Sequence, residues 1–181
     1  YVDNVFFVGT PFDGIFRGDS QGATWTRMNN GIDGLDLNNA ARIRFAVSPA
    51  TDATHAVFAA IINTAGKFQA LYRSTDVGAN WQKILPLPSS SEAALDGIDT
   101  DEDPTTDEDA EETFYGLIPG GQGATNFSMT VDATDANVVW LAGDRQDELD
   151  NNQAGCVGYS GRVFRGAIAP EPVERQQQFG G

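Results

Sequence analysis

Short apolar stretches alternate with polar turns along the whole chain. Val, Phe, Ile, Tyr and Trp are concentrated in runs such as residues 5–8, 56–60 and 138–142, and Asp, Asn, Gly and Thr separate these runs. Large and β-branched side chains favour strands, and clusters of Gly, Asn and Asp favour the turns between them. No stretch shows the period of 3.6 residues that marks an amphipathic helix. The pattern therefore predicts an all-β fold.

One of these turns carries a distinctive set of residue types. Residues 74–81 read Ser-Thr-Asp-Val-Gly-Ala-Asn-Trp. Asp76 can accept hydrogen bonds from turn N–H groups that no strand satisfies, and Gly78 can take a positive φ. Trp81 begins the return strand with a large apolar side chain. Together with Ser74, these residues predict a tight hairpin with a structural role.

The frame of this hairpin recurs upstream. Residues 18–25 read Gly-Asp-Ser-Gln-Gly-Ala-Thr-Trp, and Ser20, Gly22 and Trp25 stand 56 residues before the Asp, Gly and Trp of the other turn. The similarity extends beyond the two turns. The tripeptides before the turns, at residues 15–17 and 71–73, resemble each other and a third tripeptide at 163–165. The strand-turn-strand pattern of residues 45–60 recurs at residues 129–142. The chain is therefore a repeat of several strands per unit.

On these motifs the chain resembles the Asp-box (BNR repeat, sialidase-like) β-propellers. The resemblance covers residues 4–85 well and residues 124–168 in part. It implies a partial β-propeller of about three blades, with four-stranded antiparallel blades and Asp-box hairpins. In that family the Asp box lies on a hairpin at the blade periphery. The matching positions therefore carry over as structural residues only: Ser74, Asp76, Gly78 and Trp81, with Ser20, Gly22 and Trp25 in the degenerate copy.

The repeat divides the chain into four parts. Residues 1–40 are expected to end a first blade, residues 41–88 to form a second, residues 89–123 to be an acidic loop or linker, and residues 124–181 to form a degenerate or truncated third blade. Propellers typically close a ring of four to eight blades. We therefore interpret the chain as part of a larger assembly, in which remaining blades of the parent chain or other protein subunits cover its two ends.

Charge narrows the range of partners. The 181-residue chain has 26 acidic and 11 basic side chains and a formal net charge of −15. Nucleic acids and anionic membrane surfaces are poor partners for such a balance. No apolar run is long enough for a membrane span. A single cysteine, Cys156, excludes an intramolecular disulfide. Acidity of this degree is common in secreted or cell-surface proteins, which is the location that we expect.

Much of the negative charge lies in residues 96–112. A solvated loop is the favoured interpretation, because like charges repel and few apolar residues are available for burial. The alternative is a calcium site, since Asp99, Asp101 and Asp103 have the spacing at which an EF-hand loop begins. The sixth position of that motif is Pro104 and the twelfth is Ala110, where the motif requires Gly and Glu. No other cofactor is expected.

Two functions remain open. A glycoside hydrolase needs two carboxyl groups flanking the scissile bond, and the sequence offers many acids without singling out a pair. The Arg-Ile-Pro motif that the resemblance to sialidases would imply is missing, and Arg42, Arg44 and Arg145 are the nearest arginine candidates. We therefore predict a non-catalytic structural or interaction module. The alternative is part of a sialidase-like or xyloglucanase-like glycoside hydrolase that acts on carbohydrate.

Overall fold

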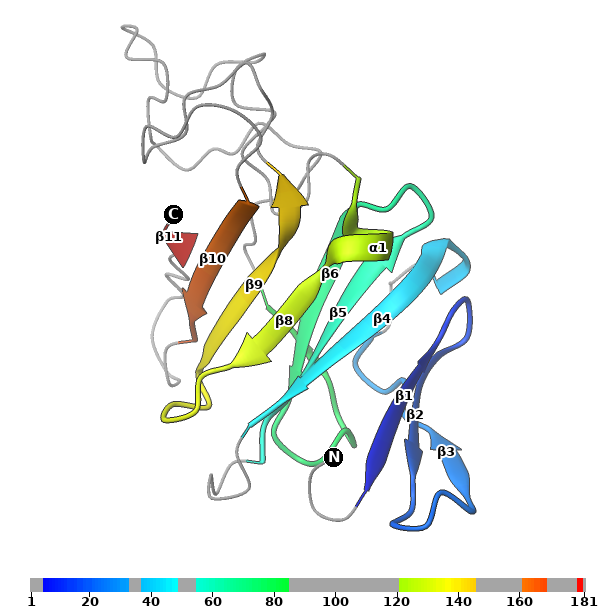
Figure 1. Ribbon diagram of the computed structural model, residues 1–181. Helices are drawn as coiled ribbons and strands as arrows, with labels where there is room; N and C mark the ends of the chain where they lie inside the picture. The colour runs from blue at the N-terminus through cyan, green and yellow to red at the C-terminus, as the bar shows by residue number, and fades with distance from the viewer. Residues whose placement is uncertain are drawn as a thin grey trace, which may run out of the picture.

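The computed structural model describes residues 5–32, 37–48, 55–84, 121–145, 161–168 and 179–180. Within these residues the chain is mostly β-strand, arranged in three antiparallel sheets (Figure 1), which confirms the predicted all-β fold. The described helices are short: η1 (Leu37–Asn39) is a single 3-10 turn and α1 (Gly123–Asn126) has four residues.

Each sheet is built from consecutive strands that lie side by side in chain order. Sheet 1 consists of β1 (Phe6–Thr10), β2 (Gly14–Gly18) and β3 (Trp25–Arg27). Sheet 2 consists of β4 (Ala40–Val47), β5 (Val57–Asn63), β6 (Phe68–Ser74) and β7 (Gln82–Lys83). Sheet 3 consists of β8 (Ser128–Val131), β9 (Val138–Arg145), β10 (Gly161–Ala167) and β11 (Phe179–Gly180).

The repeat seen in the sequence corresponds to equivalent strands of the three sheets. Residues 15–17, 71–73 and 163–165 lie in β2, β6 and β10, which are each the last strand but one of their sheets. Four strands are present in sheets 2 and 3, whereas the described residues give sheet 1 three. The predicted unit 41–88 contains all of sheet 2 except Ala40, the first residue of β4.

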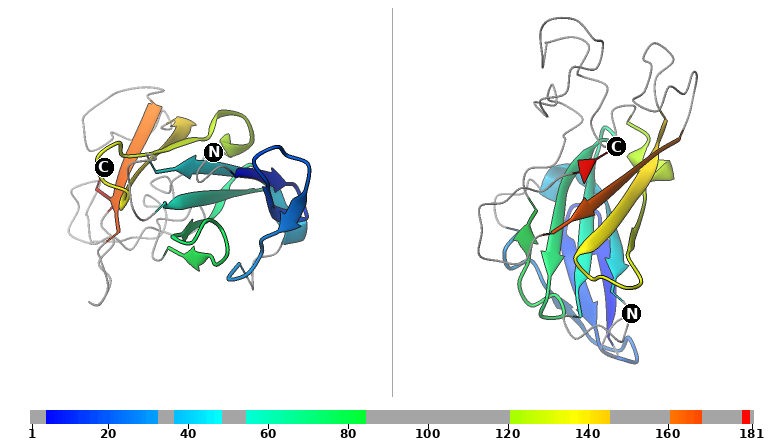
Figure 2. Two further views of the ribbon diagram at one scale, coloured as in Figure 1. Left: turned by 90° about the horizontal axis from the view of Figure 1, so that it is seen from below. Right: turned by 90° about the vertical axis from the view of Figure 1, so that its left-hand side faces the viewer.

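Sheet 2 lies between the other two sheets (Figure 2), and this position accounts for the burial of β5 on both faces. Side chains alternate between the faces of a strand. Val57, Ala59 and Ile61 are therefore packed toward sheet 1, and Phe58, Ala60 and Ile62 are packed toward sheet 3. All six side chains are fully buried. A run of consecutive apolar residues is the pattern expected of a strand that is covered on both sides.

The junction between sheets 1 and 2 is aromatic. The ring of Phe7 in β1 lies 5.9 Å from that of Phe45 in β4 and 6.3 Å from that of Trp81, which it meets edge-on. Gly9 faces Ile43 so closely that a Cβ at Gly9 would overlap the Ile43 side chain. Close contact between β1 and β4 therefore depends on the missing side chain at Gly9.

The junction between sheets 2 and 3 forms the second hydrophobic cluster. Phe68 of β6 and Phe127, which precedes β8, pack with ring centroids 5.9 Å apart. The rest of the cluster comes from inward-facing positions of both sheets: Ala46, Phe58, Ala60, Ile62 and Leu71 on one side, and Val131, Val139, Leu141 and Phe164 on the other. Both junctions are thus formed by the faces of successive sheets.

Candidate functional site

The hairpin of residues 74–81 is held by hydrogen bonds from its own side chains. The Ser74 hydroxyl donates to Asp76 Oδ1 at 2.7 Å and accepts the N–H of Gly78 at 2.8 Å. Asp76 in turn accepts the backbone N–H of Asn80 at 2.9 Å and the Asn80 side-chain amide at 2.6 Å. Gly78 has a φ of 81°, as the turn was predicted to require. These bonds satisfy turn N–H groups that no strand partner can reach.

The hairpin of residues 18–25 uses a different residue for the same purpose. Asp19, rather than Ser20, supplies the carboxylate: it accepts the N–H groups of Gln21, Ala23 and Thr24 at 3.1, 2.9 and 3.2 Å. The Thr24 hydroxyl also donates to Asp19, at 2.7 Å. The spacing of the two turns matches Ser20 with Asp76. However, Thr24 donates to Asp19 as Asn80 donates to Asp76, so Asp19 has the structural role of Asp76. Gly22 has a φ of 70°, equivalent to Gly78.

Hydrogen bonding lowers the pKa of the turn carboxylates. Burial acts on Asp76 in the opposite direction and is the largest single effect, but the bonds from Asn80, Ser74 and Ala79 together outweigh it, so the pKa of Asp76 lies below 3.8. For Asp19 the bond from the Thr24 side chain is the largest cause of a lowered pKa. The pKa of Asp132 is lowered mainly by the backbone N–H of Thr134. These three carboxylates therefore stay ionised at neutral pH.

The two hairpin tryptophans have different surroundings. Trp81 is 4% exposed, and its indole nitrogen donates to the carbonyl oxygen of Met28, the residue after β3 of sheet 1, at 2.8 Å. Trp25 occupies the equivalent position of sheet 1 and is 45% exposed. The difference follows from the order of the sheets: Trp81 packs on the sheet before its own, and the described residues place no sheet before sheet 1.

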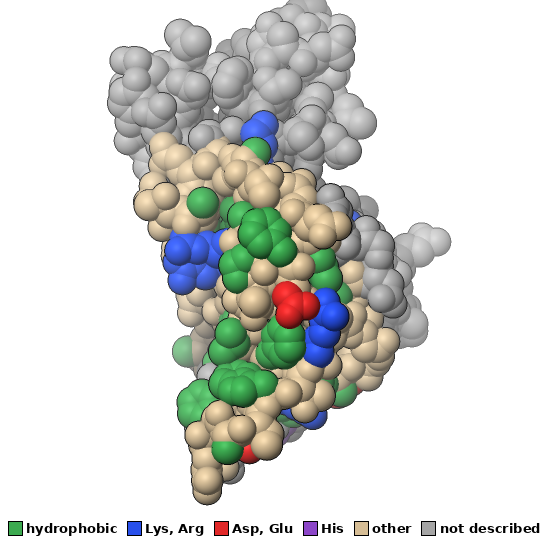
Figure 3. All heavy atoms as spheres, turned by 90° about the vertical axis from the view of Figure 1, so that its right-hand side faces the viewer, with side chains coloured by type: hydrophobic (Ala, Val, Ile, Leu, Met, Phe, Trp, Pro, Cys, Tyr) green, Lys and Arg blue, Asp and Glu red, His purple; other side chains and the backbone are tan. Residues whose placement is uncertain are grey.

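Trp25 belongs to an exposed apolar surface, the outer face of sheet 1, which is the face turned away from sheet 2. Antiparallel partners point to the same side of a sheet, and the register pairs Val8 with Phe16, Phe6 with Gly18, and Gly18 with Trp25. Phe6 is 40% exposed and Val8 is 43% exposed. Figure 3 shows hydrophobic side chains gathered on this side of the molecule.

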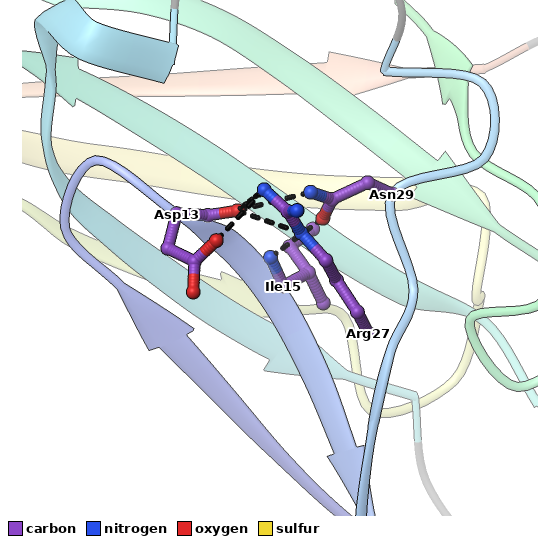
Figure 4. Close-up of polar contacts among 4 residues, drawn as sticks. All are labelled: Asp13, Ile15, Arg27 and Asn29. Carbon is purple, nitrogen blue, oxygen red and sulfur yellow. Dashed lines mark hydrogen bonds and ion pairs between the residues drawn. The ribbon is translucent and has the colours of Figure 1, made fainter.

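A polar cluster lies on the outer face of sheet 1, where the register pairs Arg27 with Phe16 (Figure 4). Arg27 on β3 pairs with the Asp13 carboxylate at 2.7 Å and donates to the Asp13 carbonyl oxygen, which also accepts a bond from the Asn29 amide. Asn29 Oδ1 accepts the N–H of Ile15 at 2.8 Å. Both charged side chains are about half exposed, so the ion pair itself adds little stability. The cluster fixes the β1–β2 turn beside β3.

A second recurring feature is a cross-strand pair of an aromatic residue and an arginine. The register pairs Phe7 with Arg17 in sheet 1, Phe58 with Arg73 in sheet 2, and Trp140 with Arg165 in sheet 3. In sheets 2 and 3 the guanidinium lies over the ring, at 5.8 and 5.7 Å from its centroid. The repeated Arg is visible in the sequence, but its aromatic partner is not, because the pairing depends on register.

In the first two pairs the arginine reaches the next sheet. Arg17 donates to the carbonyl oxygen of Val77 at 2.9 Å, and Arg73 donates to Asn137 Oδ1 at 2.8 Å. Arg165 is exposed together with Trp140, and Val163 beside them is 61% exposed. These three residues lie on the outer face of sheet 3, which is turned away from sheet 2. The described part of the chain thus presents two apolar outer faces, one at each end of the row of sheets.

The described residues do not bring the candidate catalytic and metal-binding residues together in a site. Among these residues no group of three or more His, Cys, Asp or Glu side chains is placed to hold a metal ion. Asp99, Asp101 and Asp103, with the whole acidic segment 89–112 and Cys156, lie outside the described residues. Arg42 donates to the carbonyl oxygen of Ala124, so it links β4 to α1. No helix of the described segments has the length and apolar character to cross a bilayer.

Comparison of this chain with protein-family models, with curated proteins and with solved structures finds no match.

Proposed function

We propose that this chain is a non-catalytic structural and interaction module of an Asp-box β-propeller, and that it works through the outer faces of its sheets. One observation carries the proposal. Val57, Ala59, Tyr72 and Trp81 form the face of sheet 2 that packs on sheet 1. The equivalent residues of sheet 1 are Phe6, Val8, Phe16 and Trp25. They form a face of the same apolar character, on which Phe16 is half-buried and the other three are exposed.

The arrangement of the strands supports the propeller part of the proposal. Each sheet is a meander of consecutive antiparallel strands, and successive sheets pack face to face through equivalent positions. Blades of a propeller are four-stranded sheets that repeat in this manner. The two hairpins that connect the last strands of sheets 1 and 2 carry the Asp, Gly and Trp of the Asp-box frame. The acidic composition of the chain favours a secreted or cell-surface location.

Exposed apolar faces support the interaction part. Isolated apolar residues on a surface are ordinary, but a contiguous apolar face that repeats a buried one marks a contact surface. None of Asp19, Asp76 and Asp132 has the raised pKa that a glycosidase general acid needs, because hydrogen bonds lower the pKa of all three. The described Asp19, Asp76 and Asp132 are instead used to hold turns.

Sedimentation of the purified chain tests this proposal. We expect the wild type to associate and the Val8→Lys/Val163→Lys double variant to be monomeric at the same concentrations, because each lysine places a charge on an outer face. Thr26→Lys/Gln82→Lys is the matched control, since both are exposed strand residues outside those apolar faces: Thr26 pairs with Arg17, which points toward sheet 2, and Gln82 lies in sheet 2. A wild type that sediments as a monomer, or one that hydrolyses sialoside or xyloglucan substrates, would contradict the proposal.

A further inference from the structure

We infer that the partner of each outer face is a second copy of this chain, bound head to tail, so that the outer face of sheet 3 in one copy packs on the outer face of sheet 1 in the other. This inference rests on the proposed function and adds the identity of the partner. The two described junctions show the geometry of such a contact, because each joins the arginine-bearing face of one sheet to the opposite face of the next.

The two outer faces are complementary in the same sense. The outer face of sheet 3 carries Trp140, Val163 and Arg165. These are the positions at which sheet 2 carries Phe58, Leu71 and Arg73 on its face toward sheet 3. The outer face of sheet 1 carries Val8 and Trp25. These are the positions at which sheet 2 carries Ala59 and Trp81 on its face toward sheet 1. An outer face of sheet 3 therefore matches an outer face of sheet 1 better than it matches another copy of itself.

Arg165 supplies the polar part of the contact. Arg17 crosses its junction to the Val77 carbonyl oxygen, which lies in the hairpin of sheet 2. The equivalent hairpin of sheet 1, residues 18–25, borders the outer face through Trp25, whose ring lies against Gly18. In the head-to-tail contact Arg165 meets that hairpin in the second copy, and a guanidinium bound to a carbonyl oxygen there would repeat the contact of Arg17.

The contact joins two different faces of the chain, so it is a head-to-tail contact. Such contacts produce a closed ring when the rotation between units closes and an open chain of copies when it does not. The inference is therefore a contact that pairs the outer face of sheet 3 with the outer face of sheet 1 and that can repeat from copy to copy.

A complementation experiment tests the pairing of the faces. The wild type should sediment at a multiple of the 19.3 kDa of one chain, while Val8→Lys and Val163→Lys should each be monomeric. An equimolar mixture of the two variants should form a dimer with one copy of each, because the intact sheet 3 of the first can pack on the intact sheet 1 of the second. Circular dichroism of each variant checks that it is folded, as expected for substitutions at exposed positions.

The outcomes separate the inference from the proposal on which it rests. If Val163→Lys alone still dimerises, the contact joins two sheet 1 faces and the head-to-tail inference is wrong, although the interaction role stands. A monomeric wild type contradicts both the inference and the proposal. A mixture that remains monomeric while the wild type associates contradicts the head-to-tail contact.

Discussion

The indole nitrogen of Trp81 donates a 2.8 Å hydrogen bond to the carbonyl oxygen of Met28, 53 residues earlier in the chain. The backbone N–H of Trp81 donates to the carbonyl oxygen of nearby Asn30 at 2.9 Å. The hairpin of sheet 2 is thereby fastened to the residues that follow β3 of sheet 1. A local turn motif thus also fixes the junction between two sheets.

Removal of this side chain should be costly. Trp81→Ala should lower the free energy of unfolding by about 3 kcal/mol or more, because a large buried aromatic ring and its hydrogen bond are lost. Trp25→Ala is the matched control and should cost about 1 kcal/mol or less, since Trp25 is nearly half exposed. Both substitutions are compared by chemical denaturation in the Val163→Lys background, so that association between copies does not contribute. Equal losses would contradict the different burial of the two rings.

These two tryptophans also show how far the sequence could predict the structure. The turn frame and the positive φ of Gly22 and Gly78 follow from residue types, because they are local properties. The burial of Trp81 and the exposure of Trp25 do not, because burial depends on which sheet lies beside each hairpin. Likewise the spacing matched Ser20 with Asp76, whereas the longer side chain of Asp19 reaches the N–H of Thr24.

Longer-range features needed the structure as well. The apolar run 56–60 was interpreted as a strand from the sequence, but the position of β5 between two sheets emerges only from the packing. The repeated arginine was visible in the sequence, yet its contacts with Val77 and Asn137 depend on how successive sheets are placed. The exposure of Val8 and Val163 likewise emerges only from the packing, whereas the expectation that a partner covers the two ends stays a prediction.

A second prediction concerns the two turn glycines. Gly22→Ala should cost about 1 kcal/mol, since its φ of 70° is unfavourable for any residue with a Cβ and the nearest atom, on the Trp25 ring, lies 3.9 Å away. Gly78→Ala should cost more, because the added Cβ would lie 2.5 Å from the ring of Phe7 in sheet 1. The difference between their denaturation midpoints measures how closely the hairpin approaches sheet 1. A larger effect at Gly22 would contradict the described junction.

A third prediction follows from the lowered pKa of Asp76. A carboxyl whose pKa is lower in the folded state than its ordinary 3.8 stabilises the fold above that value and loses its contribution as the pH falls through the folded-state pKa. Free energies of unfolding should therefore decrease with acid below pH 3.8. Asp76→Asn should reduce stability at neutral pH and flatten this dependence, measured by denaturation from neutral to strongly acidic pH. A parallel curve for the variant would show that Asp76 is not the responsible group.

A fourth prediction concerns the bond between sheets 2 and 3. Arg73→Met should lower the free energy of unfolding by about 2 kcal/mol, through loss of a charged hydrogen bond to Asn137 and of the cation over the Phe58 ring. A double-mutant cycle with Asn137→Ala isolates the bond itself. We expect the cost of the two substitutions together to be smaller than the sum of the single costs. Additive costs would mean that the two side chains do not interact in solution.

The most direct test of the account is whether the outer face of sheet 1 becomes covered. The chain has three tryptophans, and oxidative labelling followed by peptide mass spectrometry reports on Trp25 separately from the other two without any substitution. Oxidation of Trp25 should be fast at low chain concentration and slow down as the concentration rises, because association removes Trp25 from water. The same chain with Val163→Lys should remain rapidly oxidised at Trp25 throughout. If oxidation of Trp25 is independent of concentration in both chains, the outer face of sheet 1 is not a contact surface between copies.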